Sequence, residues 1–300
     1  MTGKLSFKSF AGIIRLPFLL LAPVCVFLAA ALAHAMAGGF EWWMLGLVLV
    51  CALSAHVAVN ALNEYQDFLS GLDLATERTP FSGGSGTLPA YPHLAPVALK
   101  ISLIAMAMTV VSGLVIVYFR GMALVLPGLL GIALIVLYTR VINRYPMLCL
   151  LSPGLGFGIL MVGGSYFALT GGYNWEVFLV SLIPFFLANN LLLLNQFPDV
   201  AADSEAGRRH LPVQYGLQVS SYFYLLFVLL AALSLIVSVY IGALPQYSLR
   251  GLLLIAAGLP VFQVASQHTA NTELLVPYMG VNVGMVLFMP LLLGVSLFQI

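Results

Sequence analysis

The sequence predicts an all-α polytopic membrane protein, a bundle of about nine transmembrane helices, and three observations support this prediction. Charged residues make up only 7% of the chain, where a soluble globular domain carries roughly a quarter. Hydrophobic residues make up 62%, and the mean hydropathy is +1.07. A water-soluble fold of 300 residues has too little interior for so much apolar surface, so most of the chain must contact lipid. Among open structures, only helices satisfy their own backbone polar groups there.

The individual helices follow from the positions of the apolar runs. A spanning helix needs about 20 predominantly apolar residues. Taken in order, the runs of this kind cover residues 11–36, 41–62, 96–119, 121–139, 148–169, 175–197, 219–241, 248–266 and 275–298. The first run is longer than a signal-peptide core of about 7–15 residues, so we expect it to be retained as a membrane helix. We expect residues 1–300 to form a single domain.

The basic residues indicate how the bundle is oriented. With the N-terminus inside, the inner connections and helix ends carry Lys4, Lys8, Arg15, Arg78, Lys100, Arg140, Arg144, Arg208 and Arg209. The outer ones carry only Arg120 and Arg250. Such an excess of Lys and Arg on one side is typical of cytoplasmic loops. We therefore expect an integral protein of the cell inner membrane, with its N-terminus and its two long polar connections in the cytoplasm.

The acidic residues are also concentrated on the inner side, although they contribute little to topology. The inner acids are Glu64, Asp67, Asp73, Glu77, Asp199, Asp203, Glu205 and Glu273, against Glu41 and Glu176 outside. Most of them lie in two long polar connections, near residues 63–95 and 195–218. A function that uses carboxylates is therefore expected at the inner face.

Each of these connections contains an Asn-x₃-Asp motif followed by a further aspartate. The first motif comprises Asn63, Asp67 and Asp73, and the second comprises Asn195, Asp199 and Asp203. The two asparagines are 132 residues apart, which suggests an internal repeat. Residues four apart share one face of a helix, so each Asn and Asp should point together. We expect a helix break at Gly71 that turns Asp73 back toward Asp67.

Carboxylate and amide oxygens are the ligands that Mg²⁺ prefers, and Mg²⁺ completes its coordination with water and substrate phosphate oxygens. Two facing clusters would hold a diphosphate between metal ions, whereas the simpler alternative is that these acids only cap helices. Arginine suits phosphate oxygens through its planar fork. The basic residues considered for diphosphate binding are Arg78, Lys100, Arg140, Arg208 and Arg209.

The glycine-rich stretch 82–87 allows several interpretations. It could present backbone N–H groups to an anion, act as a lid over the site, or be an ordinary loop. It lacks the Gly-Lys-Ser/Thr ending of a P-loop, which argues against nucleotide binding.

The paired motifs resemble those of the UbiA superfamily of intramembrane prenyltransferases. The second motif and its sequel Gly207-Arg-Arg-His-Leu-Pro-Val213 match that family, as do Arg15-Leu-Pro17 and Tyr138-Thr139. The first motif resembles the 1,4-dihydroxy-2-naphthoate (MenA-like) branch more than the 4-hydroxybenzoate branch. The segment Thr79–Pro89 differs from the basic stretch usual in the naphthoate branch, and this difference leaves the acceptor open.

The resemblance implies a Mg²⁺-dependent enzyme that transfers a polyprenyl group from polyprenyl diphosphate to an aromatic quinone precursor, as in menaquinone synthesis. The implied metal-binding and catalytic residues are Asn63, Asp67, Asp73, Asn195, Asp199 and Asp203. The implied diphosphate-binding residues are Arg78, Lys100, Tyr138, Arg140, Arg208 and Arg209. The implied partners are the polyprenyl diphosphate, the aromatic acceptor and the bilayer, with no nucleic acid.

Other functions remain open from the sequence. Within the superfamily, the alternatives are a terpene cyclase and a prenyltransferase for another acceptor. A membrane transporter also carries repeats and intramembrane acids, but its sites usually lie near the bilayer midplane. Here the acids lie at one face, which favours an enzyme.

Overall fold

The structure, a computed structural model, describes residues 5–267 and 272–298, so Lys4 lies outside it. All regular elements in these ranges are helices. They are α1 (Phe7–Ile13), η1 (Leu16–Leu20), α2 (Leu21–Ala37), α3 (Trp42–Ser70), α4 (Leu72–Ala75), α5 (Thr87–Ala90), η2 (Pro92–Leu94), α6 (Ala95–Arg120), η3 (Met122–Leu124), α7 (Val125–Leu137), η4 (Ile142–Arg144), α8 (Pro146–Gly154), η5 (Leu155–Gly163), α9 (Gly164–Thr170), α10 (Trp175–Asn195), α11 (Val200–Glu205), α12 (Leu211–Tyr240), η6 (Gln246–Arg250), α13 (Gly251–Ala256), α14 (Gly258–Gln267) and α15 (Thr272–Ser296).

Within the described ranges, eight helical stretches are long and apolar enough to cross a membrane. They are Leu16–Ala37, Trp42–Ser70, Pro92–Arg120, Pro146–Thr170, Trp175–Asn195, Leu211–Tyr240, Gln246–Gln267 and Thr272–Ser296. The helix predicted over 121–139 is present as the shorter apolar stretch Met122–Leu137. The predicted helical membrane bundle is therefore confirmed, with one of its members shorter than a full span.

The first predicted helix, 11–36, is interrupted. Arg15 has a left-handed backbone with φ of 51°, and this separates α1 from η1 and α2. Pro17 follows at the start of η1, where its missing N–H costs no helical hydrogen bond. The carbonyl of Ile14, left free by the break, accepts a hydrogen bond from Asn60 Nδ2 at 2.9 Å. The break therefore fixes the Arg15 backbone against α3.

The fifth predicted helix also contains an irregular segment. It begins as α8, continues as the π-helix η5 and ends as α9. Pro153 lies just before the change and cannot donate a backbone hydrogen bond. A Cβ on Gly158 would lie 2.7 Å from the Phe185 Cα atom, so this glycine lets η5 approach α10 closely. Single π-turns are often found at functional sites.

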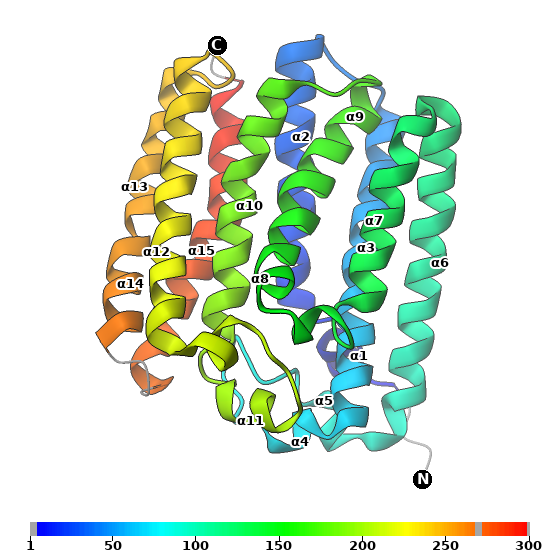
Figure 1. Ribbon diagram of the computed structural model, residues 1–300. Coiled ribbons are helices and arrows are strands. Elements are labelled where there is room, and N and C mark those ends of the chain that lie inside the picture. The colour runs from blue at the N-terminus through cyan, green and yellow to red at the C-terminus, as the bar shows by residue number, and fades with distance from the viewer. Residues whose placement is uncertain (1–4, 268–271, 299–300) are drawn as a thin grey trace.

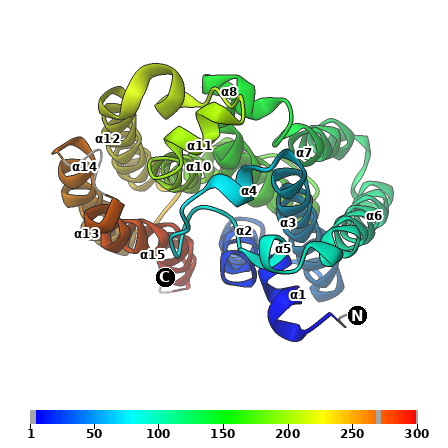
Figure 2. The same ribbon diagram turned by 90° about the horizontal axis from the view of Figure 1, so that it is seen from below.

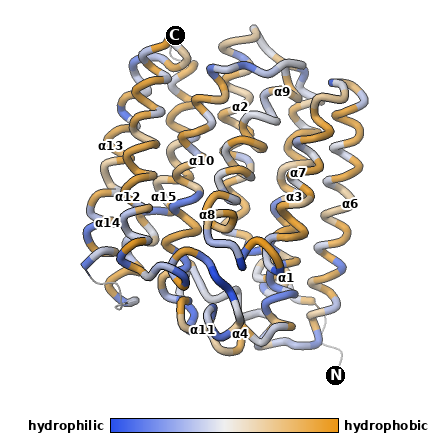
Figure 3. Tube along the Cα trace, viewed as in Figure 1, coloured by the Kyte–Doolittle hydropathy of each residue, from blue (hydrophilic) through white to orange (hydrophobic). Residues whose placement is uncertain are grey.

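The apolar residues lie both between the helices and on their outer surface. The main buried cluster joins α2, α10, α12 and α15 with η5 and α9. Large apolar side chains such as Trp42 (78% exposed), Tyr118 (83%) and Leu253 (80%) face outward. So much exposed apolar surface suits lipid contact rather than water. Figure 3 shows the hydrophobic colour running along most of the length of the long helices.

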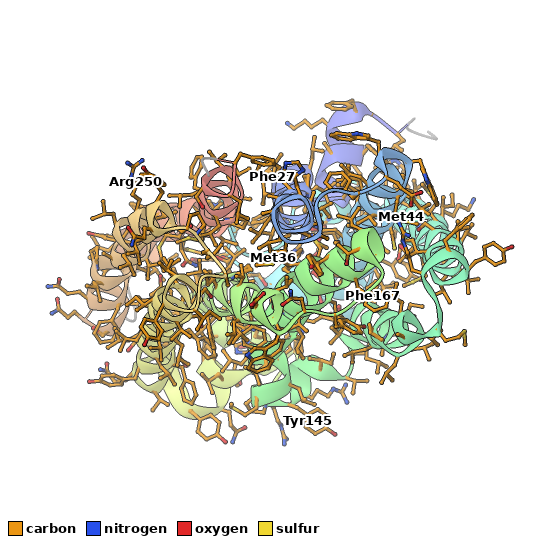
Figure 4. The ribbon with its side chains drawn as sticks, turned by 90° about the horizontal axis from the view of Figure 1, so that it is seen from above. Phe27, Met36, Met44, Tyr145, Phe167 and Arg250 are labelled. Atoms are coloured by element: carbon orange, nitrogen blue, oxygen red, sulfur yellow. The ribbon has the colours of Figure 1, made fainter. Side chains whose placement is uncertain are left out.

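Seen along the bundle in Figure 4, Tyr145 and Arg250 project from the rim, whereas Met36 lies among the helices. The opposite end, which faces the reader in Figure 2, carries short helices joined by irregular loops. There α4 and α11 contact each other across the middle of the bundle, and α5 packs against α3. We call this end, formed by α4, α5, α11 and the last turns of α3 and α10, the aspartate end (Figure 1).

Candidate active site

The first aspartate motif lies on a continuous helix. The apolar run ends near residue 62, but α3 extends to Ser70, so Asn63 and Asp67 lie one turn apart on its last turns. Gly71 then takes a left-handed conformation with φ of 80° and ends the helix, as expected. The chain turns into α4, where Asp73 is only 3% exposed. This break brings a third buried polar side chain back near Asp67.

The second motif does not lie on one helix, which corrects the expectation that Asn195, Asp199 and Asp203 share a single helical face. Asn195 ends α10, a turn covers 196–199, and Asp203 belongs to α11. Pro198 explains the break, because proline has no N–H to donate and disfavours helical geometry in the residue before it. The carbonyl of Asp199 accepts a hydrogen bond from the Asp203 N–H at 2.8 Å, so α11 restarts at once.

Arg208 joins the two motifs. Its guanidinium donates to Asp203 Oδ1 at 2.9 Å through Nη1 and to Asp67 Oδ1 through Nη2. The other oxygen of Asp203, Oδ2, lies 2.7 Å from His210 Nε2, and both of these side chains are buried. A positive group therefore already lies between carboxylates of the two motifs. Of the basic residues considered for diphosphate binding, Arg208 is the one that the structure, over its described residues, pairs with aspartate carboxylates.

The glycine-rich loop folds among the carboxylates. The Gly83 N–H donates to Asp199 Oδ2 at 3.2 Å. The Ser85 N–H and Oγ donate to the two oxygens of Glu64 at 2.7 and 3.0 Å. A Cβ on Gly84, whose φ is 73°, would lie 2.7 Å from Asp73 Oδ1. The loop is therefore an ordered part of the aspartate end, and these two backbone N–H groups already hydrogen-bond the protein's own carboxylates.

Glu64 and Arg15 were not predicted to be site residues. The sequence places Glu64 among the inner acids, and Arg15 among the inner basic residues and in the family resemblance. Glu64 is fully buried and accepts a hydrogen bond from Arg15 Nε at 2.9 Å. It thus connects the break between α1 and η1 to both α3 and the glycine-rich loop. The sequence signal was available, because a glutamate directly after the motif asparagine needs a buried cation. The sequence could not identify which arginine supplies it.

The remaining basic residues lie farther from the carboxylates. Arg78 approaches the loop, with its Nη2 3.5 Å from the carbonyl of Asp73. Lys100, Arg140 and Arg209 are exposed, and the structure gives their side chains no hydrogen bond or ion pair within the described residues. Tyr138 lines the larger cavity described below. Diphosphate binding by Arg78, Lys100, Tyr138, Arg140 and Arg209 stays a prediction.

The donor set at the aspartate end fits Mg²⁺. Three oxygens of the two motifs are buried without a hydrogen-bond partner among the residues that the structure describes, namely Asp73 Oδ2, Asn195 Oδ1 and Asp199 Oδ1. Burial, followed by the nearby carboxylates of Glu64 and Asp67, raises the pKa of Asp73 to about 7. Burial and the carboxylate of Asp203 raise the pKa of Asp199 to about 7. A cation would satisfy these oxygens and favour the ionised carboxylates.

Within the described residues, no three His, Cys, Asp or Glu side chains form a ready-made metal site. Mg²⁺ does not require one, since it commonly uses one or two carboxylates and takes its other ligands from water and substrate phosphates. Asn63 Nδ2 donates to Thr139 Oγ1 at 3.0 Å, which leaves the amide oxygen of Asn63 available as a ligand. The six predicted metal-binding residues stay a prediction, and the orphaned oxygens are compatible with it.

An apolar cavity of about 490 Å³ begins beside the aspartate end. Its polar lining residues include Arg15, Asn63, Tyr138 and Asn195, and its walls are formed by aliphatic residues of α3, α6, α7, η5 and α10. Leu114 of α6 and Leu129 of α7 line it although they are 63% and 59% exposed, so the cavity reaches the outer surface between these helices. The arrangement places a charged site next to a long apolar space, as an amphiphilic ligand requires.

Comparison with known proteins agrees with this arrangement. The model of the UbiA prenyltransferase family matches residues 22–275. The 1,4-dihydroxy-2-naphthoate octaprenyltransferase of Haemophilus influenzae is 27% identical over 252 residues, covering 75% of this chain and 78% of that protein. The Bacillus subtilis protein of the same name is 28% identical over 171 residues, covering 56% of this chain and 54% of that protein.

Solved structures share the fold at low sequence identity. A structure of digeranylgeranylglyceryl phosphate synthase superposes with a TM-score of 0.69 at 16% identity, covering 98% of this chain and 99% of that one. A UbiA homologue from Archaeoglobus fulgidus bound to DMAPP and Mg²⁺ superposes with a TM-score of 0.67 at 12% identity, covering 97% and 99%. These likenesses concern the fold alone.

Proposed function

Because this chain belongs to the UbiA prenyltransferase family and is a membrane-embedded prenyltransferase, we propose that it transfers a polyprenyl group from polyprenyl diphosphate to an aromatic acceptor with the help of Mg²⁺. The observation that supports this most directly is the bridge that Arg208 forms between Asp67 and Asp203, carboxylates of the two motifs, beside the 490 Å³ cavity. The diphosphate would bind at the aspartate end, and the isoprenoid tail would enter the cavity.

The chain's own residues supply most of what the reaction needs. Asn63, Asp67, Asp73, Asn195, Asp199 and Asp203 would hold Mg²⁺. When bound, Mg²⁺ neutralises charge that develops on the departing diphosphate. Arg208 lies between Asp67 and Asp203, where it would add a second positive group beside the leaving oxygens.

The cavity would protect the reactive carbon once the diphosphate bond breaks. The carbon left behind is an allylic cation, which water would quench. The walls near Asn63 and Asn195 are formed largely by aliphatic and aromatic side chains, among them Phe157 and Leu160. Tyr138 lines the same cavity, and the face of its ring could stabilise a cation.

For the acceptor, we propose 1,4-dihydroxy-2-naphthoate or a close analogue. Both curated relatives described above carry that name, and the first motif has the spacing of that branch. We further propose that residues 1–300 act as a single domain and that the aspartate end faces the cytoplasm of the inner membrane. The basic residues on this side of the bundle support that orientation.

Pyrophosphate release by the purified protein in detergent tests the function. It is measured from labelled polyprenyl diphosphate with and without Mg²⁺, in the presence of dihydroxynaphthoate, hydroxybenzoate or no acceptor. We expect Mg²⁺-dependent release together with prenylated dihydroxynaphthoate. Release without an acceptor would indicate a cyclase or hydrolase instead, and prenylated hydroxybenzoate alone would change the acceptor. No release from folded protein would contradict the proposal.

A further inference from the structure

A second, smaller cavity lies on the other side of a shared wall. Its volume is about 130 Å³, and it is lined by residues of η1, α2, α3, η5, α10 and α15, together with Phe81 and Arg15. The two cavities have six lining residues in common, namely Arg15, His56, Asn60, Phe157, Leu191 and Asn195. A molecule in the small cavity would therefore lie next to the polar end of the large one, where the reactive carbon of a bound prenyl group is expected.

His56 is an unexplained polar residue in this wall. Its side chain lies in the membrane-spanning part of α3, is only 6% exposed and lines both cavities. Its Nδ1 atom has no hydrogen-bond partner in the described part of the chain, and its ring packs edge-on against Phe157 with the centroids 4.9 Å apart. A buried polar atom without a partner destabilises a protein by about 1–3 kcal/mol. Such an atom beside a cavity is available to form a hydrogen bond with a molecule that enters the cavity.

The small cavity has the size and lining of a site for an aromatic ring. An apolar cavity of about 150 Å³ is known to hold benzene, and this one measures about 130 Å³. Phe18, Phe81 and Phe157 supply apolar and aromatic surface. Arg15 adds a positively charged guanidinium, whose Nε donates to Glu64. A ring that carries a hydroxyl and an acidic group would thus meet a partner for each.

We propose that the small cavity holds the reacting ring of the aromatic acceptor and that His56 hydrogen-bonds a hydroxyl group on that ring. This inference rests on the proposed function. An aromatic hydroxyl can donate to or accept from an imidazole nitrogen, so either tautomer of His56 can make the bond. His56 would therefore set both the orientation of the ring and the preference for hydroxylated acceptors.

The reaction then balances without a further co-reactant. The bond between the prenyl C1 and the diphosphate oxygen breaks, and its electron pair leaves with the diphosphate. A ring carbon supplies two electrons to form the new bond to C1. The ring regains aromaticity when that carbon loses a proton to the departing diphosphate or, if it bears a carboxylate, loses CO₂. A hydroxyl that donates to His56 would make the ring a better electron donor.

The test compares two probes that differ in their hydroxyl groups, 1,4-dihydroxy-2-naphthoate and 2-naphthoate. Their binding to the purified protein is followed by naphthalene fluorescence, and their prenylation is assayed separately. We expect the wild type to bind the hydroxylated probe about 10- to 100-fold more tightly, the range for one buried hydrogen bond. His56→Phe should remove this preference and leave the binding of 2-naphthoate unchanged. His56→Gln, which keeps a polar group, should retain part of it.

His34→Phe is the matched control, because His34 is exposed on α2 and lines neither cavity. It should leave the preference unchanged. If His56→Phe weakened the binding of both probes equally, His56 would have a purely structural role and the inference would be overturned. An unchanged preference in His56→Phe would also overturn it. The proposed function fails separately if the wild type binds the probes with this preference but prenylates neither.

Discussion

The two aspartate motifs share the Asn-x₃-Asp pattern but differ in backbone conformation. In the first, α3 carries Asn63 and Asp67 on one unbroken helix and breaks only at Gly71. In the second, α10 ends at Asn195, and the turn around Pro198 separates it from Asp203. The shared spacing is therefore not evidence of a shared backbone. It specifies which oxygens are available, and the breaks decide where they point.

The carboxylates of the two motifs also differ in the groups that donate hydrogen bonds to them. The carboxylate of Asp67, from the first motif, is bound by the guanidinium of Arg208, which follows the second. The carboxylate of Asp199, from the second motif, accepts from the backbone N–H of Gly83, which follows the first. Each motif is thus held by the segment that follows the other. One contact uses a side-chain charge and the other a backbone N–H, so mutation should affect them unequally.

The largest expected effect comes from the carboxylates themselves. Asp67→Asn and Asp199→Asn should each lower turnover by about 100- to 1000-fold, the range for removing one group that stabilises developing charge. Membrane insertion should be unaffected. The measurement is pyrophosphate release at saturating Mg²⁺, with Glu205→Gln as control because Glu205 is exposed on α11. Near-normal rates in either Asn variant would remove that residue from the metal site.

The next prediction compares how two adjacent arginines contribute to stability. Arg208→Gln should destabilise the protein by about 3 kcal/mol, since it leaves the buried carboxylates of Asp67 and Asp203 without their cation. Arg209→Gln should change stability by less than about 0.5 kcal/mol, because Arg209 is exposed. Thermal unfolding in detergent measures both. Similar melting temperatures for the two variants would show that the link between the motifs contributes little to stability.

The packing of the glycine-rich loop against the carboxylates can be tested through Gly84. Gly84→Ala should place a Cβ 2.7 Å from Asp73 Oδ1 and add the strain of a left-handed alanine. We expect turnover to fall about 10-fold, a change equivalent to about 1.4 kcal/mol. Gly38 has nearly the same φ of 76° with nothing near its Cβ position. Gly38→Ala should therefore lower stability while leaving turnover unchanged, and equal turnover in both variants would count against a role for the loop.

An effect no larger than that of Gly84→Ala should come from a residue outside both motifs. Thr139→Val removes the hydroxyl that accepts from Asn63 Nδ2, so the amide of Asn63 can turn away. Losing a group that orients a metal ligand typically costs about 10- to 100-fold in affinity or activity, and we expect the lower limit here. The readout is the Mg²⁺ concentration that gives half-maximal turnover. Thr170→Val is the control, since the hydrogen bonds of the Thr170 hydroxyl go to backbone groups of Tyr166 and Gly172. An unshifted Mg²⁺ curve would leave Asn63 oriented by other contacts.

Much of the architecture could be predicted from the sequence. Hydropathy alone locates the spans, because lipid requires long apolar helices, and the shorter fourth run becomes the shorter helix Met122–Leu137. The motif spacing identifies Asp67, Asp73 and Asp203, all of which the structure buries at one end of the bundle. The break at Gly71 was also predictable, because glycine adopts a left-handed backbone at little cost.

Other features depend on contacts between distant segments, which local patterns do not encode. The left-handed backbone of Arg15 is held by contacts to Asn60 and Glu64 on a different helix. Pro198 is a sequence signal against a continuous helix through the second motif, but a proline within an apolar run is also compatible with a kinked helix. The pairing of Arg208 with Asp67 could not be predicted, because the two residues are 141 positions apart in the sequence.

The size of the larger cavity has a consequence for the products. If about 150 Å³ holds one ring, a cavity of about 490 Å³ has room for about three groups of isoprene size. A longer tail would leave between α6 and α7, past the exposed Leu114 and Leu129, and lie among the lipids. The protein would then lack a molecular ruler, and the length of the product would be decided by whichever polyprenyl diphosphate the cell supplies.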